Sequence, residues 1–370
     1  MFQRWERVTE KKVAENPLGL SEQDRIYVDG LIVGGEENRQ MARQLYDHHQ
    51  AEGTIKAYSR TIAAFKRYCE ETESLSYEEF GEKEVLNFII EAVAKDKGPQ
   101  FLATIKPAVE RIEEMRGIPK EKTAFTAVVN KHLAGAKRTA TQAAPKKIKK
   151  EAIPVELIEE ILEKDIYAKG SNIENIDFET LRTVFKWVVQ AQTFCRFDEF
   201  SRLRACDFRF NEDKEGIIVS FCRGAKNDQM HKGNERVLPR QRGKIFDAYT
   251  LTLIFFEKCG YKMDQKDQGI NHCAMTKNGK PVQRRLSRQA ASKGTAKLLR
   301  KYGYDPRKYG ETSAKRTGVT NAYRQGVPLE KIQELGNWRT PGMPREYVQA
   351  TDEYKAELAK SMNLGVGTSK

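Results

Sequence analysis

The sequence has no long apolar run and no pairing pattern among its cysteines, and each absence excludes a class of protein. No stretch of about 18 apolar residues occurs, so no membrane-spanning helix is predicted. The residues after Met1 lack the apolar core of a secretory signal, so we expect an intracellular protein, nuclear in a eukaryotic host and otherwise in the cytoplasm or nucleoid. The 6 cysteines include no Cys-x-x-Cys pair, which argues against a disulfide framework or a structural zinc site.

Side-chain groups that hold metal ions are also missing from the sequence. No cluster of Asp and Glu, and no set of His and Cys, stands at metal-ligand spacing. We therefore predict neither a metal nor another cofactor.

Basic residues outnumber acidic ones, which predicts an anionic partner. The 370 residues include 65 Lys and Arg against 52 Asp and Glu, a formal charge of +13. Charge alone leaves DNA, RNA and a membrane surface open as partners. With 39% hydrophobic residues, the chain can bury the cores of two or three domains and is not a disordered tail.

The basic residues are concentrated in two stretches, and the first of these predicts a domain boundary. Six basic residues and no acidic one lie between Lys137 and Lys150, together with Pro145. We interpret residues 137–153 as an extended basic linker, either a solvated tether or one that lies along phosphates. Its lysine-rich core also fits a nuclear import signal.

Before this linker, apolar residues recur every three or four positions, which predicts a helical domain over residues 46–136. Four helices are expected, at residues 55–69, 85–93, 101–115 and 126–133. An ordinary helical domain with a solvated basic face fits this pattern, as does a DNA-binding domain. Residues 1–45 form an extension whose role the pattern does not predict.

Residues 154–370 are expected to form a second domain, mostly helical but with a small antiparallel hairpin. Helices are predicted from residue 154 and over 177–194, and strands at 216–222 and 235–239. The predicted fold class of the chain is therefore mostly α with a small antiparallel sheet, α+β.

The second basic stretch runs from Lys277 to Lys308. It holds eleven basic residues and one acid, Asp305. A stretch with charge of one sign is expensive to fold unless an anion neutralises it, so we expect this stretch to contact the anionic partner.

An arginine motif follows the predicted helix 177–194. Arg196 is followed by x-x-Glu-Phe, and then by Leu203-x-x-x-Asp207. This pattern resembles the first arginine motif of the tyrosine recombinases, the phage-integrase family, which has Arg-x-x-Glu-Leu and then Leu-x-x-x-Asp. The resemblance implies that Arg196 is the first catalytic arginine and that Glu199 is a structural partner of the surrounding helix.

Two further motifs carry the same resemblance. In the predicted hairpin, residues 224–229 (Gly-Ala-Lys-Asn-Asp-Gln) look like the family's Ser-Lys-Thr-Asp-Gln turn, which makes Lys226 the general acid. Near the carboxyl end, a Gly-x-Trp motif ends at Trp338 and is followed nine residues later by Tyr347. By resemblance Tyr347 is the nucleophile, and Trp338 packs against it and offers its indole N–H to a phosphate oxygen.

The fourth motif departs from the family, which has His-x-x-Arg at the start of a helix. No histidine follows position 272. With the spacing to the later motifs held fixed, the histidine position falls on Thr312 and the arginine position on Lys315, whereas a shift of one residue gives Ser313 and Arg316. We favour the first register for the backbone and keep Arg316 as a functional replacement, because a guanidinium bridges two phosphate oxygens and an ammonium does not.

The resemblance covers about residues 50–363. It implies a core-binding domain and a catalytic domain that together hold double-stranded DNA. The implied chemistry cuts a strand through a 3′-phosphotyrosine and rejoins it, in site-specific recombination or integration of a mobile element. No membrane partner is implied. The closing segments look most like recombinases of eukaryotic mobile elements of the Crypton or Ngaro type. An apolar stripe at Tyr354, Leu358 and Met362 either caps its own domain or docks on a neighbouring protomer. The family's assemblies imply a dimer on each site and a tetramer in synapsis.

Two other functions fit the same residues. A DNA-binding protein that keeps this fold but has lost catalysis is favoured by the missing histidine. A type IB topoisomerase shares the chemistry and would relax DNA as a monomer.

Overall fold

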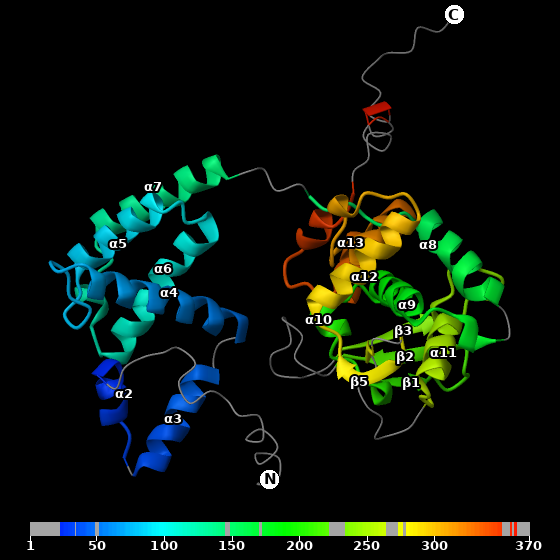
Figure 1. The fold of residues 1–370 in the computed structure, drawn as a ribbon, viewed down its shortest axis with the longest axis horizontal. Coiled ribbons are helices and arrows are strands. Elements are labelled where there is room, and N and C mark those ends of the chain that lie inside the picture. The colour runs from blue at the N-terminus through cyan, green and yellow to red at the C-terminus, as the bar shows by residue number, and fades with distance from the viewer. Residues whose placement is uncertain are drawn as a thin grey trace, which may run out of the picture. The chain divides into compact units, whose positions relative to one another are not determined.

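The computed structural model describes residues 23–33, 35–48, 52–144, 149–169, 172–221, 234–263, 273–276, 279–349, 356, 359 and 360. The chain divides into two compact units, Met1–Lys147 and Ile148–Lys370, each considered by itself (Figure 1). Within the described ranges, no helix is both long and apolar enough to span a bilayer.

The first unit is helical and has its core among α4 to α7. Its elements are η1 (Gln23–Arg25), α2 (Ile26–Gly30), α3 (Glu36–His48), α4 (Glu52–Glu71), α5 (Glu82–Ala94), α6 (Pro99–Met115), η2 (Lys120–Lys122) and α7 (Ala127–Ala143). The four helices predicted from the apolar spacing are confirmed as α4 to α7. Phe65 of α4 is fully buried, and its ring centroid lies 5.3 Å from that of Phe80 and 5.1 Å from that of Phe88.

A buried carboxylate ties η1 to the helices that follow it. Asp24 is fully buried and accepts hydrogen bonds from the Arg116 guanidinium and, at 3.1 Å, from the hydroxyl of Tyr77. A buried carboxylate is costly unless it is paired in this way. Residues 23–25 are therefore built into the helical unit, which the predicted division at residue 45 did not anticipate.

The predicted start of the linker at residue 137 is wrong, because α7 continues to Ala143. The side chain of Thr126 caps the helix by accepting a hydrogen bond from the backbone N–H of Val129. Alanine recurs along α7, and no proline occurs between Ala127 and Pro145, so helix propensity extends the helix through the basic residues. Lys137 and Arg138 are therefore helical.

The second unit is arranged around one long helix, α9 (Phe178–Thr193) (Figure 1). Its other helices of about two turns or more are α8 (Val155–Ile161), α11 (Ala248–Cys259), α12 (Arg288–Lys301), α13 (Ser313–Arg324) and α14 (Leu329–Leu335). Shorter helical turns are α10 (Phe197–Phe200), η3 (Leu162–Ile166), η4 (Tyr167–Lys169), η5 (Ile173–Asn175), η6 (Ala205–Asp207), η7 (Pro306–Lys308) and η8 (Met343–Glu346).

The predicted hairpin is confirmed as part of a three-stranded antiparallel sheet. The strands β1 (Phe208–Phe210), β2 (Gly216–Ser220) and β3 (Glu235–Pro239) lie in that order, with Ile218 opposite Val237. A second pair joins β4 (Cys273–Met275) to β5 (Pro281–Arg285). The predicted fold class, mostly α with a small antiparallel sheet, is confirmed.

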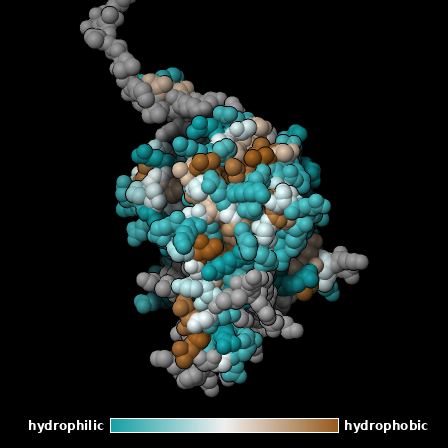
Figure 2. All heavy atoms as spheres, turned by 90° about the vertical axis from the view of Figure 1, so that its left-hand side faces the viewer, coloured by the Kyte–Doolittle hydropathy of each residue, from teal (hydrophilic) through white to brown (hydrophobic). Residues whose placement is uncertain are grey.

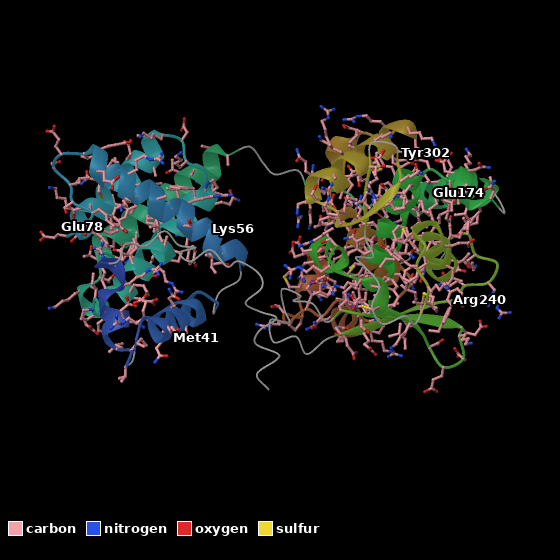
Figure 3. All side chains as sticks on the ribbon, turned by 60° about the horizontal axis from the view of Figure 1, so that its bottom comes forward. Met41, Lys56, Glu78, Glu174, Arg240 and Tyr302 are labelled. Atoms are coloured by element: carbon pink, nitrogen blue, oxygen red, sulfur yellow. The ribbon has the colours of Figure 1, made fainter. Side chains whose placement is uncertain are left out.

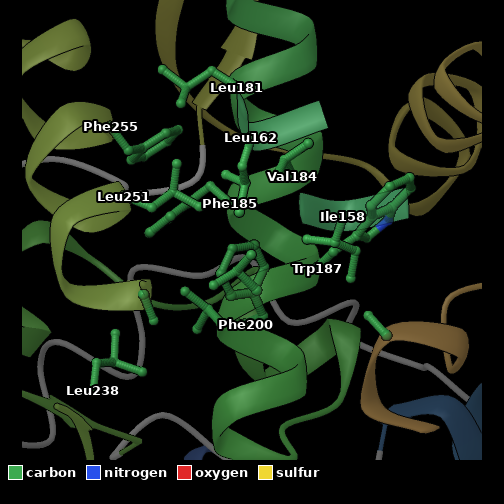
Figure 4. Packing of buried hydrophobic residues seen from close by; sticks show 14 of the residues in the cluster. Ile158, Leu162, Leu181, Val184, Phe185, Trp187, Phe200, Leu238, Leu251 and Phe255 are labelled. Atoms are coloured by element: carbon green, nitrogen blue, oxygen red, sulfur yellow. The ribbon is translucent and has the colours of Figure 1, made fainter. Parts of the chain in front are cut away.

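The core of the second unit surrounds α9, as Figure 4 shows for Leu181, Val184, Phe185 and Trp187. Phe185 stacks on Phe255 of α11, with ring centroids 4.2 Å apart. Nearly every side chain of α9 is buried, which is typical of a central helix rather than an amphipathic surface helix.

Helix α13 approaches α9 so closely that only glycine fits at the contact. A Cβ atom added at Gly318 would lie 1.8 Å from the carbonyl oxygen of Ala191. Because α9 ends two residues after Ala191, this contact brings α13 against the end of α9.

The second basic stretch is neutralised in part within its own unit, because five acids pair with six of its eleven basic residues. Six of its residues pair with acids: Arg285, Arg288, Lys297, Lys301, Arg307 and Lys308. Asp165, for example, lies 2.6 Å from Lys301 and accepts a hydrogen bond from Tyr302, which is labelled in Figure 3. Most of these acids lie far away in the sequence, so local charge counting could not reveal them.

The face shown in Figure 2 is mostly hydrophilic, with apolar side chains scattered among polar ones. Exposed apolar residues of the first unit include Leu31, Val33 and Met41. Scattered apolar side chains are ordinary on protein surfaces and do not by themselves define a binding surface.

Candidate active site

Arg196 occupies a fixed position where the chain leaves α9. Phe194 ends the helix in the left-handed conformation with φ 51°, and Arg196 then caps α10. Glu199 accepts hydrogen bonds from the Arg196 backbone N–H at 2.7 Å and from its guanidinium at 3.0 Å. The carboxylate therefore orients the arginine, whose side chain is 26% exposed and accessible to a ligand.

Both basic residues at the start of α13 reach Tyr347, but in different ways. Arg316 donates a hydrogen bond from Nη1 to the backbone carbonyl oxygen of Tyr347 at 3.2 Å. Lys315 is 1% exposed, and its Nζ lies 4.1 Å from the ring centroid of Trp338 and 5.1 Å from that of Tyr347. Within the described ranges, this buried amine has no hydrogen-bond partner.

The environment of Lys315 favours its neutral form. Burial, helped by the nearby cations Arg196 and Arg236, lowers the pKa of Lys315 to about 7, although Glu199 and Cys195 act in the opposite direction. At neutral pH the amine is therefore shared between its neutral and charged forms.

Trp338 is held over the site by the backbone before it. A Cβ atom added at Gly336 would lie 1.9 Å from the indole ring, so the glycine makes room for the ring to fold back. Asn337 has φ 49°, a left-handed conformation that asparagine tolerates better than most residues. The indole packs between Phe194 and Tyr347, with ring centroids 6.3 and 5.3 Å away. Its Nε1 is buried and has no partner among the described residues.

Tyr347 follows the short turn η8 and is partly buried. Its carbonyl oxygen also accepts a hydrogen bond from the hydroxyl of Thr320 at 3.3 Å, so two residues of α13 hold this backbone. The side chain packs on the cluster formed by Phe194, Val319, Ile332 and Trp338.

A buried ion pair fixes the start of α13. Lys186 of α9 is 3.3 Å from the carboxylate of Glu311 and donates a hydrogen bond to the hydroxyl of Thr295 on α12 at 3.0 Å. The carboxylate also accepts a hydrogen bond from Ser292 at 3.0 Å. The ion pair therefore joins α9 and α12 to the residues that lead into α13.

Arg236 is a basic residue of the site that the sequence reasoning missed. It is 5% exposed on β3, donates a hydrogen bond to the carbonyl oxygen of Thr193, and lies with Cζ 4.7 Å from the ring centroid of Phe221. The signal was present in the alternation of β3, which places Arg236 on the same inward face as Leu238.

Five of the seven predicted site residues come together: Arg196, Lys315, Arg316, Trp338 and Tyr347. Thr312 does not join them, since it is exposed at the start of α13 and its side chain makes no capping hydrogen bond. Lys226 lies outside the described residues, as does the predicted stripe of Tyr354, Leu358 and Met362. In the described part of the chain, no group of three or more His, Cys, Asp or Glu side chains is arranged to hold a metal ion.

The architecture around this site matches solved structures of DNA recombinases. XerH site-specific recombinase bound to palindromic difH substrate aligns with a TM-score of 0.52 at 16% identity, over 94% of this chain and 92% of that one. The Tn1549 transposon integrase in complex with transposon right end DNA aligns with a TM-score of 0.51 at 12% identity, over 86% of this chain and 97% of that one. The fold is that of the tyrosine recombinases. At the level of sequence, no family model and no curated protein matches the chain, so the recombinase fold is recognised from the structure.

Proposed function

We propose that this chain breaks and rejoins DNA strands through Tyr347, as a tyrosine recombinase. The observation that carries the proposal is that Lys315, Arg316 and Trp338 all converge on Tyr347. The recombinase fold supports it, because the two solved structures of this fold described above contain DNA.

The reaction needs positive charge near the tyrosine. A phenol with a pKa of about 10 is only about 0.1% ionised at neutral pH, and a phosphodiester anion repels nucleophiles. Arg196 and the basic residues of α13 would stabilise the charge that grows on the phosphorus centre, an effect of about 3 kcal/mol per donor. The unpaired Nε1 of Trp338 would donate to a phosphate oxygen.

The leaving group is the 5′-hydroxyl of the broken strand, and we assign its protonation to Lys226. The product is a 3′-phosphotyrosine that keeps the energy of the broken bond. Another 5′-hydroxyl can then attack it and rejoin the DNA, with neither a nucleotide cofactor nor a metal ion required.

The first unit would contact the duplex through α4. Lys56, Arg60 and Arg67 are exposed and, because their spacing is four and seven residues, they share one face of the helix. The buried Ile62 and Phe65 lie on the opposite side. Such a stripe is suited to binding phosphates. For each phosphate that it neutralises, the slope of log K for DNA binding against log salt concentration should become more negative by about 0.9.

At a finer level, we propose site-specific recombination or integration of a mobile element of the Crypton or Ngaro type. The protein would act as a dimer on each DNA site and as a tetramer in synapsis, within the nucleus of a eukaryotic host. The basic residues between α7 and α8 would lie along phosphates in a linker between the two units.

The proposal is tested by trapping the covalent intermediate. Duplexes that bind the protein are first selected from a random library, and the selected site is then rebuilt with a nick so that cleavage is irreversible. We expect an adduct that resists denaturant from the wild type and none from Tyr347→Phe. Tyr323→Phe, which alters a neighbouring tyrosine of the same cluster, serves as the matched control.

Two other functions make different predictions in the same assay. A DNA-binding protein without catalysis would bind the selected sites and form no adduct. A type IB topoisomerase would relax supercoiled plasmid as a monomer, whereas a recombinase exchanges strands between two sites.

A further inference from the structure

The proposed nucleophile has no histidine beside it in the described part of the second unit. The family's histidine position falls on Thr312, which is exposed at the start of α13. The phenol of Tyr347 must nevertheless lose its proton when it attacks phosphorus. A basic group at the site has to accept that proton.

We infer that Lys315 is the general base that takes the proton from Tyr347, an inference that rests on the proposed function. Its Nζ is buried, has no hydrogen-bond partner among the described residues, and lies 5.1 Å from the centroid of the Tyr347 ring. Catalytic hydrogen bonds are often long in the absence of substrate and tighten when it binds.

The three guanidinium groups beside Tyr347 and Lys315, those of Arg316, Arg196 and Arg236, are less suited to this role. Arg316 already donates to the Tyr347 carbonyl, and a guanidinium is not deprotonated in proteins. Arg196 is a guanidinium as well, and it is engaged with the carboxylate of Glu199. Among the described side chains at the site, the amine of Lys315 is the basic group that can exist without a proton.

The charged groups around Lys315 keep it available as a base. Arg196, which caps α10, and Glu199 of α10 face it from one side, and Arg236 faces it from β3. The thiol of Cys195 is also close, but burial raises the pKa of that thiol to about 11, so the thiol is neutral. Burial and the two guanidinium groups outweigh the one carboxylate, and the pKa of Lys315 is lowered to about 7.

The step balances in protons and charge. The Tyr347 oxygen forms a bond to phosphorus while its proton moves to Nζ of Lys315, and the bond from phosphorus to the 5′ oxygen breaks as Lys226 donates a proton to that oxygen. The new ammonium of Lys315 appears beside the phosphorus centre as negative charge accumulates there. Rejoining runs the same transfers in reverse.

A pH profile of single-turnover adduct formation tests this assignment. Below pH 7 the wild-type rate should fall about tenfold per pH unit, because the protonated amine cannot accept a proton, and above pH 7 it should level off. Lys315→Arg keeps the positive charge but removes the base. Its rate of adduct formation should be about 100-fold lower at pH 7, and its pH profile should lack the inflection. A Lys315→Arg profile with the wild-type inflection would overturn the assignment.

Two histidines of the second unit lie outside the described residues, and they serve as controls. His231→Ala and His272→Ala should each keep the inflection near pH 7. Its loss in either variant would move the base to that histidine and overturn the role of Lys315.

A substrate with sulfur at the bridging 5′ position separates the base from the acid. A thiolate leaves without needing a proton, so this substrate should restore cleavage by Lys226→Ala. It should not restore cleavage by Lys315→Arg, because the nucleophile still keeps its proton. Restoration of Lys315→Arg would make Lys315 the acid instead.

An NMR titration of the free protein with 13C-labelled lysine tests the neutral amine without DNA. The resonance that Lys315→Arg removes should titrate near 7, whereas ordinary lysines titrate near 10.4. A midpoint near 10 would refute the inference and leave the proposed function standing. Absence of a wild-type adduct on every selected site would instead overturn the proposed function, and the base role with it.

Discussion

The close crossing of α13 over α9 makes Gly318→Ala the most informative single substitution in the second unit. The added Cβ would lie 1.8 Å from the carbonyl oxygen of Ala191, whereas Cβ contacts under 3.0 Å essentially never occur. The contact is with backbone, so no side chain can rotate away. Helix α13 must therefore move by about 1.2 Å, and Lys315 and Arg316 move with it.

Two opposing effects set the change in the free energy of unfolding of Gly318→Ala. Overpacking costs about 1–3 kcal/mol, and a rigid backbone contact belongs at the upper end of that range. Alanine in place of glycine stabilises the helix by about 1 kcal/mol through its higher helix propensity. We expect Gly318→Ala to lower the free energy of unfolding by about 2 kcal/mol and to slow DNA cleavage by about 100-fold, because a displacement of about 1 Å has that effect on positioned groups.

Urea unfolding measured by circular dichroism, together with adduct formation, checks both numbers. Gly135→Ala in α7 is the matched control, since nothing lies within 4 Å of its added Cβ. The free energy of unfolding of that variant should rise by about 1 kcal/mol, and it should cleave DNA at the wild-type rate. If Gly318→Ala is as stable as the wild type and cleaves at the same rate, the helices do not cross in the way that we describe.

Three further predictions concern the site and the DNA contact. Gly336→Ala should expel the Trp338 ring and lower the cleavage rate at least tenfold. The first effect would be seen as a red shift of tryptophan fluorescence and the second as slow adduct formation, and an unchanged spectrum would contradict the prediction. Glu199→Gln should loosen Arg196 and slow cleavage while leaving DNA affinity within about twofold, and an equal loss of affinity would show that Glu199 acts on binding instead. Arg67→Gln should reduce the slope of log K against log salt by about 0.9 in fluorescence anisotropy, with no change expected if α4 lies away from the duplex.

Elements with a clear apolar period could be predicted from the sequence. The spacing of Ile62 and Phe65 predicted α4, and the apolar run before Phe194 predicted α9, because burial of one face or of a whole helix leaves a direct pattern. The strand signal likewise predicted the pairing of β2 with β3. For the candidate site, motif spacing selected five residues that the fold brings together.

Features that depend on distant partners could not be predicted in this way. The pairing of Asp24 with Arg116 spans most of the first unit, and that of Lys301 with Asp165 spans much of the second. Arg236 was missed because strand alternation shows that a residue points inward but not what it meets there. The predicted start of the basic linker lies too early in the chain. A run of basic residues suggested an extended linker there, but the alanine-rich sequence forms a helix instead.

The central claim is that Tyr347 becomes covalently bound to DNA. Mass spectrometry of the trapped adduct, after digestion with trypsin and nuclease, should find the nucleotide on the peptide of residues 346–355 and fragment ions should place it on Tyr347. Attachment to any other residue, including Tyr354 of the same peptide, or a wild-type protein that binds its selected site without forming an adduct, would contradict the account.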